Sequence, residues 1–401
     1  MPEKDENHEK IETGLAVKIG VAALFRIVFN TARRFTYPFA PALSRGLGVH
    51  ITSVTSLIAV NQAAGLLGAF LGPVSDRLGY RMVMLAGLGL LTVGMLGCGF
   101  FPFYFVIMAA LFLAGLAKSV FDPAFQAFVG ERVPYKKRGF VIGLTEFSWA
   151  ASSLIGIPVA GILIDRLGWR SPFFALGILG FAGIISLIIM IPPDKKRVIN
   201  NPGWEGYFAS LKKLGENRSA LGTLGLIFFI SAANDNLFVV YGLWLEKEFG
   251  LSIIAIGIGT TVIGVAEFAG EALTALLSDR FGLRRSIAAG LIISSACYLI
   301  LPLFGKNLSF ALAGLFMVFL FFEFAIVCSI SLCTEILPEA RATMMSGYLA
   351  ASGLGRMTGA LIGGPVWLAG GLPATGIVSA AVSLLALFSF IWGERGRRIR
   401  V

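Results

Sequence analysis

The chain has 401 residues, of which 56% are hydrophobic and only 14% are charged, and its formal net charge is +10. Soluble domains carry roughly 25% charged residues, so this composition excludes an ordinary soluble enzyme or binding domain. A bilayer accommodates so much apolar surface at roughly 20 residues per transmembrane helix, and the length leaves room for twelve such helices with short loops.

The first residues are strongly polar, and no basic segment leads into a cleavage site. We therefore expect a cytoplasmic tail over 1–16, disordered over 1–13, and no secretory signal. Apolar runs then predict twelve helices in chain order. Their expected ranges are 17–43, 51–74, 82–101, 103–129, 139–164, 172–191, 221–245, 252–278, 285–304, 308–334, 343–369 and 372–393.

The polar interval 192–220 separates six predicted helices from six, so we expect bundles over 17–191 and 221–393, a cytoplasmic linker between them and a basic tail over 394–401. Cytoplasmic loops carry an excess of Lys and Arg. With the N-terminus in the cytoplasm, 23 of the 33 Lys and Arg lie on that side and 5 on the other. This predicts a multi-pass protein of the inner or plasma membrane with both termini cytoplasmic, and it explains the net charge without nucleic acid as a partner.

A short motif occurs twice. The segment 76–81 (DRLGYR) returns 203 residues later as 279–284 (DRFGLR), and Arg138 after a proline returns as Arg341 after a proline at the same offset. One copy alone would also fit a tight, positively charged helix connector. Two features at one offset predict duplicated six-helix halves, and parallel repeats of this kind place a substrate site between the halves near the bilayer midplane.

The longer segment 72–81 (GPVSDRLGYR) resembles the G-x-L-x-D-R-x-G-R-R loop between helices 2 and 3 of the major facilitator superfamily, with Val74 and Tyr80 in place of the usual Leu and Arg. The resemblance extends over 17–393. It implies an all-α membrane fold of two pseudo-symmetric six-helix bundles, and a secondary transporter that works by alternating access and is not an enzyme.

The resemblance also implies a charge cluster that holds the halves together on the cytoplasmic side in the outward-open state and breaks on inward opening. In the family the loop joins an acid at the end of helix 4, which corresponds to Glu131 here, with Glu335 as its counterpart. The expected gating residues are Gly72, Asp76, Arg77, Gly79, Arg81, Glu131, Arg138, Asp279, Arg280, Gly282, Arg284, Glu335 and Arg341.

Two Gly and Pro patterns are similar to those of drug/proton antiporters in that family. The segment 152–161 (SSLIGIPVAG) is similar to G-x-x-x-G-P-x-x-G-G with Ile157 between the Gly and the Pro, and 359–365 (GALIGGP) keeps G-x-x-x-G-G-P. The resemblance implies an antiporter of this subclass. Residues that only permit close helix packing and a kink explain the pattern equally well.

Charged residues inside the predicted helices are the main clues to a site. A charge at the bilayer centre costs roughly 2.5–3.5 kcal/mol on insertion scales, so these side chains should pair or face water. The substrate and proton site candidates are Arg26, Asn30, Arg33, Arg34, Tyr37, Lys118, Asp122, Glu146, Asp235, Glu267, Glu271, Glu323 and Arg356. The near balance of basic and acidic residues predicts pairing, with one carboxylate left to bind a proton.

The first predicted helix places Arg26, Asn30, Arg33 and Tyr37 on one face, which we expect to meet the cavity or a partner helix. We predict that Arg33 or its neighbour Arg34 pairs with Asp235 across the two halves. A static ion pair within one half is the alternative.

Three further acids have expected partners. Lys118 and Asp122 stand at i and i+4 and predict an intrahelical pair, for which Glu146 competes. Glu267 and Glu271 also share a helix face, where mutual repulsion favours protonation of one. Neutralisation of that pair by Arg356 or by cytoplasmic water is the alternative. Glu323 lies among aromatic residues, and its expected partner is again Arg356.

The leading functional hypothesis is proton-coupled efflux of small hydrophobic or amphipathic compounds, in which protonation of a cavity carboxylate weakens an ion pair and shifts the inward–outward equilibrium. The carboxylates considered for that step are Asp235, Glu146, Glu267 and Glu271. The alternative is transport of an organic anion or anionic lipid bound by the arginines of the first helix, and a third hypothesis is a non-transporting receptor on the same fold.

The expected partners are membrane lipids, a small-molecule substrate and protons, and we expect a monomer without cofactor or metal. The chain has only two His residues and no G-x4-G-K-S/T phosphate loop. These absences argue against a metal enzyme and an ATP-driven pump.

Overall fold

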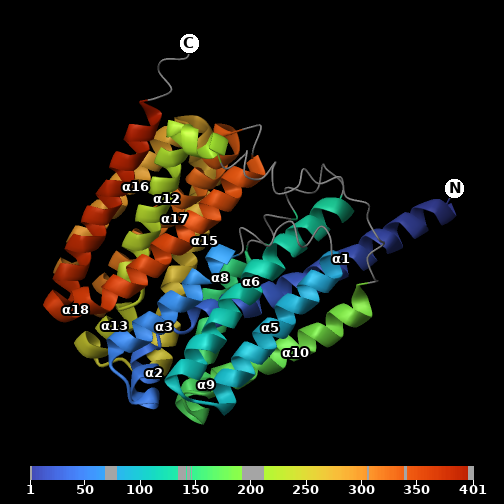
Figure 1. Cartoon of the computed structure of the whole chain (residues 1–401), viewed down its shortest axis with the longest axis horizontal. Coiled ribbons are helices and arrows are strands. Elements are labelled where there is room, and N and C mark those ends of the chain that lie inside the picture. The colour runs from blue at the N-terminus through green and yellow to red at the C-terminus, as the bar shows by residue number, and fades with distance from the viewer. Residues whose placement is uncertain are drawn as a thin grey trace.

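The computed structural model describes residues 2–67, 79–133, 141, 145, 147–191, 212–304, 307–337 and 341–395. Every regular element within these ranges is a helix, as predicted. Figure 1 shows the helices in two groups, one coloured blue to green and the other yellow-green to red, which pack side by side.

The helices of the N-terminal half follow the apolar runs of the sequence. They are α1 (Pro2–Arg34), α2 (Ala40–Leu47), α3 (Ile51–Ala63), α5 (Tyr80–Phe100), α6 (Tyr104–Arg132), α8 (Ser148–Ala151), the π-helical turn η1 (Ser152–Gly156), α9 (Ile157–Leu167) and α10 (Ser171–Met190). The turn η1 interrupts one predicted helix in its middle, so α8, η1 and α9 together form a single crossing.

The C-terminal half repeats this order. Its elements are α12 (Arg218–Phe238), α13 (Tyr241–Phe249), α14 (Ile253–Gly259), α15 (Thr261–Phe281), α16 (Leu283–Ile300), the 3-10 turn η2 (Leu301–Phe304), α17 (Leu308–Ile336) and α18 (Arg341–Glu394). The long helix α18 contains the last two predicted crossings, because non-helical backbone at Gly370 and Gly371 divides it.

Nine helices in the described ranges are long and apolar enough to cross a membrane, or ten if the pair Ala40–Leu47 and Ile51–Leu67, bent by 114°, counts as one span. The continuous segment Thr343–Glu394 counts once in this set although it bends back on itself. Helix α1, with three arginines in its second half, is not in the set. Each of the twelve predicted ranges nevertheless has a helical counterpart.

The start of the first helix differs from the prediction. Helix α1 begins at Pro2 instead of residue 17, so the expectation of a disordered tail over 1–13 is corrected from Pro2 onward. The segment is rich in Glu and Lys, which are good helix formers, and this propensity extends the apolar helix backward. Residues 192–211 of the predicted linker and 396–401 of the predicted C-terminal tail lie outside the described residues.

Backbone geometry confirms the duplication predicted from the repeated motif. Gly79 and Gly282 precede the third helix of each half with φ/ψ of 88°/146° and 82°/140°. Gly48 and Gly250 end α2 and α13 with φ of 64° and 61°. Glycine adopts such positive φ values at no steric cost, so the two halves turn at equivalent places for the same reason.

The two halves meet along two helix pairs, α3 with α18 and the segment η1–α9 with α14–α15. The second pair is tight, because a Cβ at Gly264 would lie 2.9 Å from the Cβ of Ser153. At the end opposite the termini, α2 also contacts α13, where Arg45 Nη1 lies 2.6 Å from Glu246 Oε1. These contacts place the buried charges of α1, α12 and α15 at the junction of the halves.

Close packing within a half also depends on glycine. A Cβ at Gly94 of α5 would lie 2.7 Å from the carbonyl oxygen of Ala110 in α6, so Gly94→Ala is expected to destabilise the protein by about 1–3 kcal/mol. At Gly89 on the same helix nothing lies within 4 Å of such a Cβ. Gly89→Ala should be neutral or stabilising by up to ~1 kcal/mol. Thermal unfolding midpoints in one detergent measure both effects, and equal midpoints would refute this packing of α5 on α6.

Candidate functional site

The second half of α1 carries buried polar side chains that contact neighbouring helices of its own half. Arg26 Nε lies 3.1 Å from Asp122 Oδ1 on α6, and Arg26 Nη1 donates to the carbonyl oxygen of Thr145 at 3.0 Å. Asn30 Nδ2 donates to Ser148 Oγ on α8 at 3.2 Å. These contacts hold α1 against α6 and α8.

An ion pair between Arg34 and Glu267 joins the two halves. Arg34 Nη2 donates to Glu267 Oε1 at 2.6 Å, and Arg34 Nη1 donates to Oε2 at 3.1 Å. The two side chains are only 2% and 3% exposed. A bidentate Arg–carboxylate pair is among the strongest polar contacts in proteins, so it fixes the end of α1 to α15 of the opposite half.

The segment α8–η1 completes the surroundings of this pair. Trp149 Nε1 donates to Glu267 Oε1 at 3.2 Å, and Ser153 Oγ donates to Oε2 at 3.3 Å. The guanidinium of Arg34 lies 4.3 Å from the centre of the Trp149 ring and donates to Ser152 Oγ at 3.4 Å. Each oxygen of Glu267 therefore accepts two hydrogen bonds. Short π-helical turns such as η1 are frequent at functional sites.

Asp235 of α12 lies at a second contact between the halves. It is fully buried and accepts a hydrogen bond of 2.7 Å from Tyr37 Oη, which belongs to the N-terminal half. Arg356 Nη1 of α18 lies 3.3 Å from the other carboxylate oxygen. The carboxylate thus receives one donor from each half.

The predicted pairing of Arg33 or Arg34 with Asp235 is therefore wrong in its partners, although a cross-half ion pair from α1 exists. Consecutive residues point in directions about 100° apart on a helix with 3.6 residues per turn. Arg34 faces α8 and α15, whereas Arg33 faces α3, where its Nε donates to Gln62 Oε1 at 2.9 Å. Because α1 is one continuous helix, Arg26, Asn30 and Arg33 lie on one side of it as predicted, but each contacts a different neighbouring helix.

The predicted intrahelical pair on α6 is confirmed. Lys118 Nζ contacts Asp122 Oδ2 one turn further along, and Arg26 contacts the other oxygen of the same carboxylate. Asp122 therefore pairs with two cations, Lys118 and Arg26, of which only Lys118 was predicted. Glu146, the expected competitor for Lys118, lies outside the described residues.

The predicted pairing of Arg356 with Glu323 is also wrong, because Arg356 contacts Asp235 instead. Glu323 is buried in α17 and has no hydrogen-bond or salt-bridge partner in the part of the chain that the structure describes. It lies beside α15, since a Cβ at Gly270 would be 2.7 Å from the Cβ of Glu323. Glu271 is half-buried on the same helix. Glu267 is neutralised by Arg34, which was not among the partners predicted for it.

The described residues of the repeated motif tie the third helix of each half to the sixth. Arg81 Nη2 donates to the carbonyl oxygen of Ile188 at the end of α10 at 2.8 Å. Arg284 Nε lies 2.6 Å from Glu394 Oε2 at the end of α18. The predicted gating residues Gly72, Asp76, Arg77 and Arg138 lie outside the described residues, as do the side chains of Asp279 and Arg341.

The remaining gating candidates are described, and Glu131, Arg280 and Glu335 are exposed at the end that bears the termini. Glu335 has no hydrogen-bond or salt-bridge partner among the described residues. The charge cluster implied by the resemblance therefore stays a prediction.

Several residues of the site were missed at the sequence level. Trp149 is the most central of them, because Arg34, Arg356 and Lys118 lie 4.3, 5.6 and 5.9 Å from the centre of its ring. A lone Trp just before the Gly and Pro pattern was the available signal. Gln62, a polar residue in an apolar run, was the corresponding signal for the partner of Arg33.

Comparison with known proteins gives one consistent result. The family model described as Major Facilitator Superfamily matches residues 22–227 and 223–400. An uncharacterized MFS-type transporter, YwfA of Bacillus subtilis (strain 168), is 26% identical over 389 residues, which are 95% of this chain and 92% of that protein. The multi-drug resistance efflux pump PmrA homolog of Lactococcus lactis subsp. lactis (strain IL1403) is 24% identical over 372 residues, with 88% of each chain covered.

A solved structure has the same fold. The bacterial homolog of the human lysosomal transporter Spinster, in its inward-facing and occupied conformation, superposes with a TM-score of 0.74 at 15% sequence identity. The match covers 96% of this chain and 97% of that one. At this identity the match shows the shared architecture of two helical bundles and nothing finer.

Proposed function

The chain belongs to the major facilitator superfamily and is a multi-pass membrane transporter, not an enzyme, and we propose that it couples substrate movement to protons through the Arg34–Glu267 pair. The observation that carries this proposal is the buried bidentate contact between the two halves. Transport by alternating access requires that such a contact break and reform in each cycle. Protonation of Glu267 supplies the means, because it removes the charge that holds Arg34.

The energetics favour a switch at this point. With both charges present the pair is satisfied, but removal of one charge leaves the other buried without a partner, which costs about 3–5 kcal/mol. A proton on Glu267 therefore destabilises the conformation in which Arg34 of α1 is paired with Glu267 of α15. It shifts the population toward the conformation in which this contact is broken. Glu323, buried nearby without a partner in the described chain, is the proposed second proton acceptor.

The orientation proposed from the Lys and Arg distribution places both termini in the cytoplasm. In that orientation the contacts between α2 and α13, including Arg45–Glu246, lie on the outer side. We propose that protonation of Glu267 releases these outer contacts together with the buried pair, and that the twelve-helix body works as a monomer.

For the substrate we propose small hydrophobic or amphipathic compounds moved outward. Aromatic rings border the buried pair, since Arg34 also lies 5.5 Å from the ring centre of Phe238. Such rings accept flat apolar groups and cations. The relative from Lactococcus lactis is a multi-drug resistance efflux pump homolog by name, which supports outward transport of such compounds.

A proteoliposome assay tests the coupling. With ethidium as the probe and an imposed pH gradient, the wild-type chain is expected to accumulate the dye in exchange for protons. Glu267→Gln should abolish gradient-driven accumulation while exposed Glu248→Gln, on α13, leaves it unchanged. If Glu267→Gln accumulates dye in response to the gradient as the wild type does, Glu267 is not the coupling residue.

Arg33 favours a second candidate substrate class, the organic anions. It is only half-buried, and its single hydrogen-bond or ion-pair partner in the described residues is the neutral amide of Gln62. A cation without a carboxylate partner is available to a carboxylate ligand. Under this alternative, Arg33→Gln abolishes benzoate uptake and Arg45→Gln does not. Unchanged benzoate uptake by Arg33→Gln, or none by the wild type, eliminates the alternative.

A further inference from the structure

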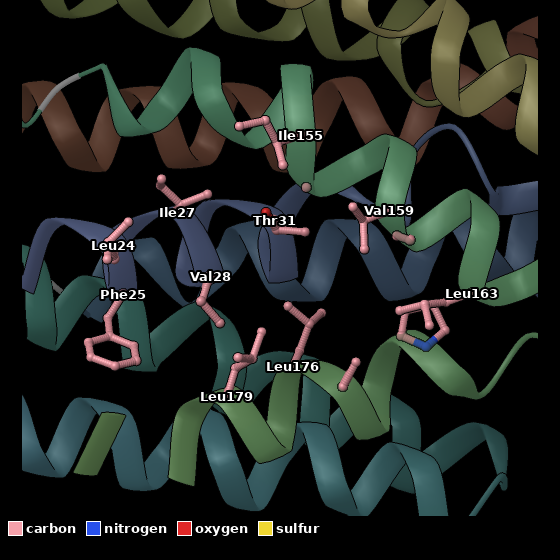
Figure 2. Close-up of a pocket in the computed structure, with 14 residues that line it drawn as sticks. Leu24, Phe25, Ile27, Val28, Thr31, Ile155, Val159, Leu163, Leu176 and Leu179 are labelled. Atoms are coloured by element: carbon pink, nitrogen blue, oxygen red, sulfur yellow. The ribbon is translucent and has the colours of Figure 1, made fainter. Parts of the chain in front are cut away.

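An apolar pocket lies on the N-terminal half, separate from the ion pairs. Its volume is about 390 Å³, and α1, α10 and the segment η1–α9 form its walls. Figure 2 shows side chains from these three elements, including Val28, Val159 and Leu176, directed toward one common space. The pocket goes beyond the transport proposal, because it shares no ionisable group with the junction of the halves.

The pocket opens sideways toward the bilayer. Its inner wall is buried, as Leu176 and Thr31 are each only 5% exposed. Its rim is exposed, since Leu24 of α1 and Ile155 of η1 are each 60% exposed. In a membrane-spanning chain, lipid covers apolar side chains that are exposed at this depth. The opening therefore faces acyl chains and not water.

A close contact between α1 and η1 closes the base of the pocket. Gly156 ends the π-helical turn η1, and because it has no side chain it lets α1 approach η1 closely. A Cβ at Gly156 would lie 2.9 Å from the Cβ of Thr31, so the base of the pocket is narrow and α1 touches η1 there. The pocket is thus a defined recess between three helices and not part of a smooth lipid-facing surface.

The chemistry and size of the recess select its occupant. None of its described lining residues is charged, and Thr31 is the sole polar side chain among them. A polar solute would lose hydration there without replacement hydrogen bonds. The span from Leu24 to Thr31 is about 10 Å along the helix, and the volume of the recess is about 390 Å³. These dimensions fit part of one hydrocarbon chain.

We propose that this recess binds one acyl chain of a phospholipid from the surrounding bilayer. The site differs from ordinary boundary lipid because the chain end inserts between α1, α9 and α10 instead of lying across them. The inserted chain contacts the outer face of η1, whose Ser152 and Ser153 hold Arg34 and Glu267 on the inner face.

Photo-crosslinking tests the proposal on the full chain in nanodiscs made of phosphatidylcholine with a small fraction of phosphatidylcholine bearing a diazirine on one acyl chain. Mass spectrometry is expected to locate the crosslinks mainly in peptides that contain 24–31 and 155–163. Val159→Trp, which fills the recess, should lower this labelling about tenfold. Ile162→Trp is the matched control, because Ile162 is exposed on the same helix but does not line the recess.

A second filling variant, Ala175→Phe on the opposite wall, controls for a folding defect in Val159→Trp. Both variants must elute from a size-exclusion column at the same volume as the wild type. Loss of labelling in both filling variants with retention in Ile162→Trp supports the site. Labelling spread evenly over lipid-facing peptides, or unchanged in a folded filling variant, overturns it and indicates boundary lipid only.

Discussion

Glu267→Ala is expected to lower the free energy of unfolding by about 3–5 kcal/mol, because it leaves the Arg34 guanidinium buried without its counter-charge. The contact is bidentate, and both side chains are almost fully buried. Unfolding by titration with sodium dodecyl sulfate in mixed micelles measures the change.

The matched control for this substitution is Glu246→Ala, which removes the more exposed ion pair Arg45–Glu246 between the halves. Arg45 of that pair is 58% exposed, and its partner Glu246 is 28% exposed, so its loss should cost only about 0–1 kcal/mol. A double variant, Arg34→Met with Glu267→Met, should recover most of the lost stability, because apolar side chains of similar volume can replace a buried pair. Equal costs for Glu267→Ala and Glu246→Ala would refute the importance of the buried pair.

Asp235→Ala is expected to have a comparable effect, about 3–5 kcal/mol, since it leaves Arg356 buried without a carboxylate and removes the acceptor of Tyr37. Tyr37→Phe deletes only the hydrogen bond to the charged oxygen and should cost about 1.5–3 kcal/mol. In the Asp235→Ala background the same substitution should cost almost nothing, because the acceptor is already absent.

This coupling is measured by a double-mutant cycle on the same unfolding titration. Additive costs of Tyr37→Phe and Asp235→Ala would mean that the 2.7 Å contact between Tyr37 Oη and the carboxylate does not stabilise the folded protein. Ser44→Ala, whose hydroxyl donates to Val49 within the N-terminal half alone, should be additive with Asp235→Ala and serves as the control.

The fold could be predicted from the sequence because membrane helices are long apolar runs and because the motif at 76–81 repeats at 279–284. The breaks within helices were missed. Pro38 disfavours helical backbone at the residue before it, and α1 ends at Arg34 just ahead of it. This signal was present but outweighed by hydrophobicity, so α1 and α2 were predicted as one helix. The π-helical turn η1 has no comparable sequence signal.

The site was predictable as a set of residues but not as a set of pairs. Buried charges in apolar runs identified Arg34, Glu267 and Asp235 as site residues. Whether Arg34 pairs with Glu267 or with Asp235 depends on how α15 and α12 are rotated and placed against the end of α1. Hydrophobic periodicity gives the face that a helix buries but not which neighbour it meets, so the partners of adjacent arginines remained beyond sequence reasoning.

The proposed transport cycle depends on a contact between the two halves that breaks when Glu267 is protonated. Spin labels at Arg166→Cys on α9 and Glu248→Cys on α13, both exposed at the end opposite the termini, report the separation of the halves there. In a Cys297→Ala background the remaining native cysteines are buried. Pulsed electron resonance should give a short distance at high pH and a longer one at low pH, with the longer distance dominant at every pH in Glu267→Gln. One distance distribution, unchanged by pH and by Glu267→Gln, would contradict the account.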